Sequence, residues 1–299
     1  MTEPETGDVL SVPYSERNSD TAESELKHQI IKLGPWHLDV QVTPTLSTRV
    51  FLDTPPETYC EGGAKDPRYI SFLSPRAWWA QLIKSIYSGG LNNRRFLDCA
   101  CNCGGYSFWS KELGASECFG FDVRHHWIRQ AEFLKKNRTW PSDGIQFRKL
   151  DLYDLPGLSL DPFHVTLFSG IFYHLPDPIT GLKAAADLTS ELFVLSTEYR
   201  PGLPDGMLAA NLEGREAVMS GVYGLCWWPT GPNVLADILR WLGFAESRVI
   251  SWQVDSPRQR GRLTIVAGRD MGILNGIRAV KGPTDVPSKT PVIDAGEAS

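Results

Sequence analysis

Short apolar runs alternate with helical patterns through the middle of this 299-residue chain. Such alternation is typical of a mostly parallel sheet that carries helices on both faces. The segment joining the last two runs, SPRQRGR, is too short for a crossover helix, so those two strands should pair antiparallel. Strands are expected at 95–99, 118–123, 145–150, 163–169, 192–197, 246–253 and 262–268, and helices at 105–113, 125–137, 177–189 and 231–242.

The segments on either side of this alternating core differ from it in composition. Residues 1–25 hold seven acids and one base without apolar periodicity, and they predict a disordered acidic arm. Residues 26–94 form an N-terminal extension or lid that includes one helix. Residues 95–269 form the α/β domain, and residues 270–299, rich in proline toward the end, are expected to be largely disordered.

The charge balance bears on the kind of partner. The chain carries 30 Lys+Arg and 35 Asp+Glu, a net charge of −5; the arm accounts for −6, which leaves about +1 for the other 274 residues. A body so close to neutral lacks the broad basic surface of a nucleic-acid binder. The sequence therefore favours a small-molecule partner and leaves a local basic groove open.

Targeting signals and thiols indicate the compartment. No apolar run approaches the ~20 residues of a membrane-spanning helix, and the N-terminus lacks a basic region followed by an apolar stretch. Three of the six cysteines alternate within one short stretch, and a disulfide-rich scaffold would not have this spacing. We expect a cytoplasmic protein with free thiols and no membrane partner.

A turn of small residues follows the first predicted strand and precedes a helix. Such a strand, turn and helix form a nucleotide-binding crevice at the carboxyl end of a parallel sheet. Asn102 stands at the second glycine position of the dinucleotide fingerprint, and Asp98 would repel a phosphate. Asp98 instead suits a cationic ligand, and Asp122, at the end of the second strand, can accept both hydroxyls of a ribose.

The segments LDCACNCGGYSFWSKELGA and GFDV resemble motif I and the acidic second-strand end of the class I S-adenosylmethionine-dependent methyltransferases. Of the usual D-x-G-x-G/N-x-G, the chain keeps Asp98, Asn102 and Gly104, and Ala100 replaces the first glycine. The resemblance covers roughly 95–268 and implies a Rossmann-like, doubly wound, seven-stranded sheet with the last strand antiparallel. It implies that S-adenosylmethionine contacts Asp98, Ala100, Asn102, Gly104, Asp122, Val123, Asp151, Leu152, Ser169 and Tyr173.

A narrower similarity lies in SGIFYHLPDP and WWPTGPNVLADILRWLGF. Both segments resemble a subgroup that contains the bacterial tRNA wobble-uridine carboxymethyltransferase and many uncharacterised methyltransferases. In that tRNA enzyme, the tyrosine matching Tyr173 helps to hold the carboxylate of carboxy-S-adenosylmethionine. This resemblance keeps a tRNA acceptor open, although the near-neutral body weighs against it.

His174 is the candidate catalytic base. It follows the fourth strand, where the methyl-donor end of the site should lie. The acceptor must lose a proton during methyl transfer, and a neutral imidazole is a suitable base near pH 7. The alternative is a structural histidine in the turn, because proximity alone can carry much of a methyl transfer.

Candidate acceptor contacts lie after the fifth strand. Aromatic faces beside polar groups suit stacking against a sugar or another ring. An ordinary loop exit or a core position is the alternative for each of them. The candidates are Glu198, Tyr199, Arg200, Tyr223, Trp227 and Trp228, the last four in the irregular stretch 200–229. No metal is expected, because the alternating cysteines lack a second pair at zinc spacing.

The sequence therefore predicts an S-adenosylmethionine-dependent methyltransferase that O-methylates a sugar or another small metabolite by in-line displacement. One alternative is methyl or carboxymethyl transfer to a tRNA wobble uridine. The other is a cofactor-binding module without turnover, for which Ala100 in motif I is the hint.

Overall fold

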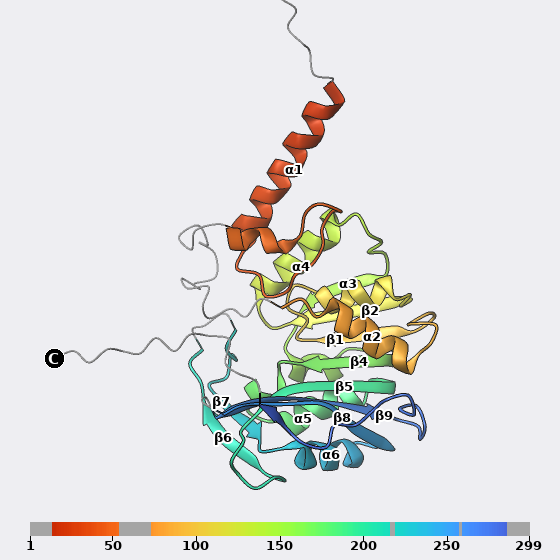
Figure 1. The fold of residues 1–299 in the computed structure, drawn as a ribbon, viewed down its shortest axis with the longest axis vertical. Helices are drawn as coiled ribbons and strands as arrows, with labels where there is room; N and C mark the ends of the chain where they lie inside the picture. Colours follow the sequence, from red (N-terminus) through yellow and green to blue (C-terminus); the bar gives the residue numbers. More distant parts are fainter. Residues whose placement is uncertain (1–13, 54–72, 216–218, 257–258, 286–299) are drawn as a thin grey trace, which may run out of the picture.

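A computed structural model describes residues 14–53, 73–215, 219–256 and 259–285 (Figure 1). The helices are α1 (Tyr14–Leu33), α2 (Arg76–Ile86), α3 (Gly105–Glu112), α4 (His125–Asn137), α5 (Pro178–Ala186) and α6 (Pro232–Trp241), with short 3-10 helices η1 (Thr48–Asp53), η4 (Leu152–Gly157) and η5 (Phe172–His174). The strands are β1 (Arg95–Cys99), β2 (Glu117–Asp122), β3 (Ile145–Lys149), β4 (Phe163–Ser169), β5 (Thr189–Tyr199), β6 (Leu208–Leu212), β7 (Leu225–Pro229), β8 (Glu246–Asp255), β9 (Arg260–Gly268) and β10 (Thr284–Asp285).

The main sheet has the order β10-β8-β9-β5-β4-β1-β2-β3. Strands β1 to β5 run parallel to one another, and β9 is antiparallel to both β5 and β8. The predicted doubly wound sheet with an antiparallel last strand is confirmed. The expected number of strands, seven, is corrected to eight in the described residues, because the short β10 joins the sheet beside β8. Because β1 and β4 are adjacent while their connections leave on opposite sides, the crevice lies at their carboxyl ends.

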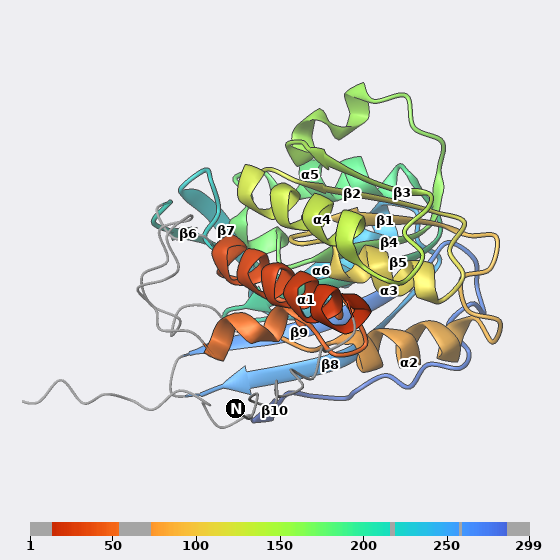
Figure 2. The ribbon, with the colours of Figure 1, turned by 90° about the horizontal axis from the view of Figure 1, so that it is seen from above.

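Alternating residues of the buried strands build two apolar layers. On β5, Leu192 and Val194 face one layer, and Phe193 and Leu195 face the other. Helices α2, α3 and α4 cover the first layer, and α5 and α6 cover the second. Figure 1 and Figure 2 show α1 projecting from the body beside α4, and its C-terminal end joins the first layer through Ile30. A parallel sheet covered on both faces explains why its strands are apolar runs without polar alternation.

The predicted acidic arm is corrected over its second half, because α1 begins at Tyr14 and runs to Leu33. The prediction of disorder rested on the polar composition, but this segment is rich in good helix formers such as Glu, Ala, Leu and Lys. Its last turns are anchored: Ile30 is fully buried, and Leu26 packs on the same layer. Residues 1–13 lie outside the described residues.

The predicted disordered tail is corrected over residues 270–285. Leu274 is fully buried, and the Arg248 guanidinium donates to the carbonyls of Leu274 and Ile277. β10 then adds an edge strand beside β8. A few buried apolar side chains hold this segment although it lacks a periodic pattern; residues 286–299 lie outside the described residues.

The irregular stretch after β5 contains an antiparallel hairpin. β6 and β7 form a separate two-stranded sheet in which Asn211 pairs with Cys226. We call β6, β7 and the described residues between them the hairpin arm; Figure 1 shows its strands at one edge of the molecule. Among the described residues, no helix has the length and apolar character needed to cross a membrane.

Candidate functional site

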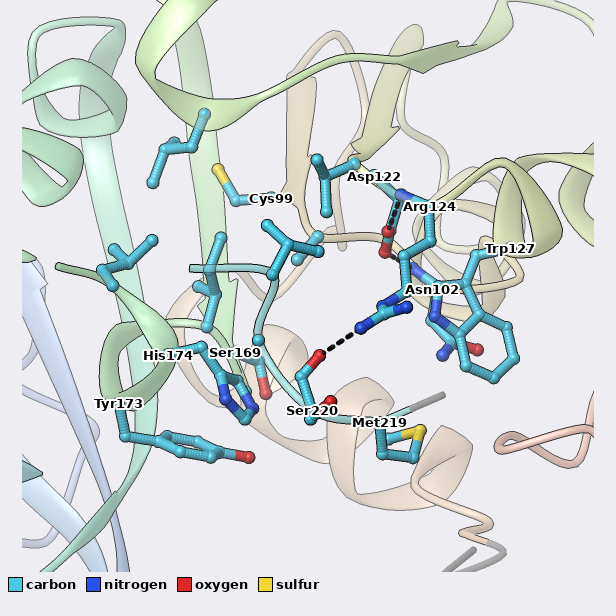
Figure 3. A pocket seen from close by; sticks show the side chains of 18 of the residues that line it. Cys99, Asn102, Asp122, Arg124, Trp127, Ser169, Tyr173, His174, Met219 and Ser220 are labelled. Carbon is cyan, nitrogen blue, oxygen red and sulfur yellow. Dashed lines mark hydrogen bonds between the residues drawn. The ribbon is translucent and has the colours of Figure 1, made fainter. Parts of the chain in front are cut away.

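A cavity of about 660 Å³ opens at the carboxyl ends of β1, β2 and β4. Its size lies within the usual range of small-molecule pockets. Figure 3 shows Asn102, Asp122 and Arg124 on one side of the space and Tyr173 and His174 on the other. The described part of the hairpin arm and the start of β9 complete the wall.

The turn after β1 forms the floor of the cavity. Ala100 and Asn102 have left-handed φ values of 54° and 53°, and Gly104 has 79°. Ala100 thus adopts the backbone conformation that glycine adopts most easily, at a cost of about 1 kcal/mol. The amide of Cys101 donates to the Phe121 carbonyl over 2.8 Å, which fixes the turn against β2.

Gly104 does not line the cavity but supports the turn from behind. A Cβ atom there would lie 2.3 Å from Cζ of Phe147. The role that the structure shows for Gly104 is packing at the start of α3, where no side chain fits; its contact with a cofactor stays a prediction.

Asp98 is a buried carboxyl on the floor. Its Oδ2 accepts hydrogen bonds from the Ser107 amide over 3.1 Å and the Ser107 hydroxyl over 2.7 Å. Burial outweighs these bonds and raises the pKa of Asp98 to about 7. A cation placed beside this group would favour its ionised form.

Asp122 is the second buried carboxyl of the floor. Its two oxygens accept from the amides of Asn102 over 3.1 Å and Arg124 over 2.9 Å. Burial raises the pKa of Asp122 to about 6. Each oxygen has further acceptor capacity for a ligand hydroxyl.

Asp151 does not line the cavity, contrary to its expected place beside the ligand. Its Oδ1 accepts from the Tyr153 amide over 3.0 Å at the start of η4, and its Oδ2 accepts from the Tyr223 hydroxyl over 2.6 Å. The expected ligand contact is therefore occupied by a tyrosine of the hairpin arm. The other expected cofactor residues line the cavity: Asp98, Ala100, Asn102, Asp122, Val123, Leu152, Ser169 and Tyr173.

His174 also lines the cavity, and a carboxylate faces its ring. The Nδ1 atom of His174 lies 2.8 Å from Oε2 and 3.0 Å from Oε1 of Glu213 on the hairpin arm. Oε1 of Glu213 in addition accepts from the Gly221 amide over 2.9 Å. Both side chains of the pair are largely buried, at 17% and 16% exposed.

Tyr173 and two arginines of β9, Arg260 and Arg262, also line the cavity. Burial raises the pKa of Tyr173 to about 12, although Arg262, which hydrogen-bonds the phenol, opposes this rise. The Tyr173 ring meets Trp228 edge-on, with centroids 5.7 Å apart, and the Arg260 guanidinium lies 5.3 Å from the Trp228 ring centroid. Aromatic and cationic groups thus adjoin one another here.

Three of the six expected acceptor contacts line the cavity, namely Glu198, Tyr223 and Trp228. The other three have structural partners. Tyr199 is buried beside Trp252, Trp227 donates to the Pro176 carbonyl over 3.0 Å, and Arg200 donates to Asn211 over 3.1 Å. The alternative interpretation, a core position or an ordinary loop exit instead of an acceptor contact, therefore fits Tyr199, Arg200 and Trp227.

Some wall residues were not among the predicted site residues. Several come from segments far from the turn, and Arg124 lies two residues after Asp122. Glu213, Met219, Ser220 and Gly221 lie in the stretch 200–229, which was expected to contribute acceptor contacts. The wall residues that were not predicted include His37, Leu38, Leu73, Tyr106, Arg124, Trp127, Glu213, Met219, Ser220, Gly221, Arg260 and Arg262. Arg124 reaches across the cavity and donates to the Ser220 carbonyl over 2.7 Å, as Figure 3 shows.

The cysteines of the turn are buried. Burial raises the pKa of Cys103 to about 12, and the pKa values of Cys99 and Cys101 are raised as well. These thiols stay neutral at ordinary pH and pack as small side chains. In the part of the chain that the structure describes, no three His, Cys, Asp or Glu side chains cluster as metal ligands would.

The chain is similar in sequence to tRNA U34 carboxymethyltransferases. It is 35% identical to the one from Nautilia profundicola over 123 residues, 40% of this chain and 39% of that protein. It is 28% identical to the one from Pseudomonas putida GB-1 over 172 residues, 57% of this chain and 51% of that protein. The chain thus spans about half the length of these relatives or less. No protein-family model matches it.

The fold is similar to that of the N-terminal domain of EvdMO1. The structure of that domain in the presence of SAH and D-fucose gives a TM-score of 0.62 at 20% identity, covering 82% of this chain and 96% of that one. The SAH-bound structure of the same domain gives a TM-score of 0.63 at 21% identity. This chain has the class I methyltransferase fold. The sheet order, the acidic strand ends and the turn after β1 all accord with it.

Proposed function

We propose that this protein is an S-adenosylmethionine-dependent methyltransferase. The observation that carries the proposal is the pair of buried carboxyls, Asp98 and Asp122, at neighbouring strand ends on the floor of one cavity in this fold. These acids accept hydrogen bonds from Ser107 and from the backbone amides of Asn102 and Arg124, and they suit a ligand that brings its own positive charge and its own hydroxyl groups.

The residues of the floor fit S-adenosylmethionine. Asp98 would hold the ammonium group, Asp122 would accept the ribose hydroxyls, and the small side chain of Ala100 lets the backbone approach the ligand. Bound S-adenosylmethionine supplies the methyl group: its carbon–sulfur bond breaks as the bond to the acceptor forms, and the sulfonium becomes a neutral thioether. The chain itself orients both reactants, and effective molarity supplies much of the acceleration.

We assign His174 as the base of this proposed reaction. It lines the cavity opposite Asn102 and Asp122, beside Tyr173 (Figure 3). Its Nε2 atom can take the proton that an acceptor hydroxyl loses, whereas Nδ1 faces Glu213.

The acceptor class that fits best is a sugar or another small hydroxylated metabolite. Trp228 and Tyr173 offer ring faces and edges, and Glu198 and Arg262 stand beside them as hydrogen-bonding groups. The presence of D-fucose with the EvdMO1 domain supports this choice. A cytoplasmic location goes with it.

A second candidate is methyl or carboxymethyl transfer to a tRNA uridine. The names of the sequence relatives favour it. So does the pair of Tyr173 and Arg262, because a guanidinium beside a phenol is well suited to a carboxylate on the donor. The third candidate, a module without turnover, loses its support, since the backbone at Ala100 keeps the left-handed turn.

Methyl transfer with a labelled donor tests the proposal. Purified protein receives S-adenosylmethionine labelled in its methyl group, with free sugars, nucleotide sugars, glycosides and bulk tRNA as separate acceptors. We expect label in a sugar hydroxyl with the wild type, and a loss of about 10²-fold or more with His174→Ala at unchanged affinity for S-adenosylhomocysteine.

Other outcomes would change the assignment. Salt-sensitive transfer to tRNA, from this donor or from carboxy-S-adenosylmethionine, would establish the second candidate. Tight binding of the donor without transfer to any acceptor would establish the module without turnover. Full activity of His174→Ala would remove the base.

A further inference from the structure

The Glu213 carboxylate faces His174 from a different part of the chain. Thirty-nine residues separate the two, and they meet because the hairpin arm folds back over the carboxyl end of β4. The contact distances of 2.8 Å and 3.0 Å to Nδ1 are those of a hydrogen bond in which a carboxylate accepts. A carboxylate has no proton to donate, so Nδ1 must carry the proton of the neutral imidazole.

Further contacts hold Glu213 in this place. Oε1 accepts from the Gly221 amide over 2.9 Å, and a Cβ atom at Gly221 would lie 2.1 Å from that oxygen and 2.9 Å from Cβ of His174. On either side of Gly221, the Ser220 carbonyl is held by Arg124 and the Tyr223 hydroxyl by Asp151. The hairpin arm is thus tied to the ends of β2, β3 and β4 around the pair.

We propose that Glu213 is the positioning residue of the catalytic base, which it keeps in the tautomer with a proton on Nδ1 and a free lone pair on Nε2. This inference rests on the proposed function of His174. In the step it serves, the acceptor O–H bond breaks and its proton bonds to Nε2, while the oxygen bonds to the methyl carbon. The imidazolium that forms then faces the Glu213 carboxylate, which stabilises its charge.

The geometry predicts a specific change of the His174 tautomer in Glu213→Gln. The Gly221 amide needs an acceptor at the Oε1 position, so the oxygen of the glutamine amide should stay there. The amide nitrogen then takes the Oε2 position, which is closer to Nδ1 (2.8 Å) than the Oε1 position (3.0 Å), and donates to Nδ1, while the oxygen at the Oε1 position accepts from the Gly221 amide. That contact moves the imidazole proton to Nε2 and removes the lone pair that the reaction needs. Glu213→Ala removes the constraint without imposing the wrong tautomer.

Nitrogen NMR of the histidine rings tests this without any acceptor. Protein labelled with ¹⁵N in its six histidines is studied at pH 8 with S-adenosylhomocysteine, and His174→Gln identifies the His174 signals. We expect a protonated Nδ1 and an unprotonated Nε2 in the wild type, the reverse in Glu213→Gln, and a mixture in Glu213→Ala and in Gly221→Ala. Glu198→Gln, which alters another carboxyl of the same wall, should keep the wild-type pattern.

A wild-type His174 protonated at Nε2, or a Glu213→Gln protein that keeps the wild-type pattern, would overturn the proposal. The wild-type spectrum alone is decisive if a variant does not fold. In a transfer assay, Glu213→Gln should lower kcat by about 10²-fold or more and below Glu213→Ala, with KM unchanged. Because the tautomers are read without turnover, failure of the proposed function and failure of this inference give different results.

Discussion

The floor of the cavity and the wall that contains the hairpin arm differ in how far apart along the chain their hydrogen-bonded residues lie. On the floor, Asp98 bonds to a residue nine positions away, and Asp122 bonds to Asn102 over 20 positions. The wall joins His174 to Glu213 over 39 positions and Asp151 to Tyr223 over 72. The floor is therefore a property of one contiguous segment, from β1 through the turn and α3 to the end of β2, and the wall exists only when the hairpin arm is docked.

This difference suggests that cofactor affinity and stability belong to the floor, while the geometry of the base and the ligand exchange rate belong to the wall. Substitutions in the two regions should thus separate by the quantity they change.

The largest effect is expected for Gly104→Ala. The new Cβ would collide with Phe147 at 2.3 Å, and φ is 79°, so the free energy of unfolding should fall by about 3 kcal/mol. Gly157→Ala is the matched control, because nothing lies within 4 Å of a Cβ there, and urea unfolding measures both. Equal stability of the two variants would contradict the packing role of Gly104.

The next effect is the loss of cofactor affinity in Asp98→Asn. An uncharged amide keeps hydrogen bonding with Ser107 but cannot pair with an ammonium group, so binding of S-adenosylhomocysteine should weaken by about 30-fold. Asp143→Asn, at an exposed turn position, is the control. Unchanged affinity in Asp98→Asn would place the ligand elsewhere in the cavity.

A smaller effect concerns pH in the unliganded protein. The pKa of Asp98 is raised by burial to about 7, so between about pH 4 and pH 7 the folded state binds more protons than the unfolded state. This group therefore lowers the stability as the pH rises through that window. Asp98→Asn should gain on the order of 1–2 kcal/mol relative to the wild type between pH 5 and pH 8, measured by urea unfolding. A difference that is constant with pH would show an unshifted pKa.

The smallest effect is expected in the wall. Tyr223→Phe removes the 2.6 Å bond to Asp151 that helps to dock the hairpin arm, so S-adenosylhomocysteine should dissociate about threefold to tenfold faster, as stopped-flow fluorescence would record. Tyr153→Phe, whose hydroxyl bonds to Asp177 outside the cavity wall, is the control. If Tyr223→Phe instead changed stability as much as Gly104→Ala does, the two regions would not be separable.

The same difference between the floor and the wall explains which features could be predicted from the sequence. The strands, their antiparallel end and the acidic floor follow from periodicity and from one contiguous motif, and the strands expected at 95–99 and 163–169 agree with β1 and β4. The resemblance to the methyltransferases implied that Asp151 lies beside the ligand, but one oxygen of its carboxylate accepts from the Tyr223 hydroxyl instead. Glu213 lies in the stretch 200–229, which was expected to contribute acceptor contacts. Its pairing with His174 could not be predicted, since only the folding of the hairpin arm brings the two together.

The ends of the chain were misjudged for a related reason. Composition describes average solvation, whereas a few anchors decide whether a segment is ordered. Ile30 anchors α1, and Leu274 anchors the segment before β10. Neither belongs to a periodic pattern long enough to be recognised.

Calorimetric titration of the wild type with S-adenosylhomocysteine at pH 8 and at pH 5.5 tests the central claim most directly. Asp98 and Asp122, with pKa values raised to about 7 and about 6, are ionised at the higher pH. At the lower pH, Asp98 must release a proton to pair with the ammonium group, and Asp122 must release one to accept from both ribose hydroxyls. We predict one site per chain with micromolar affinity at pH 8, about tenfold weaker at pH 5.5. Folded protein that binds no S-adenosylhomocysteine at either pH would contradict the account.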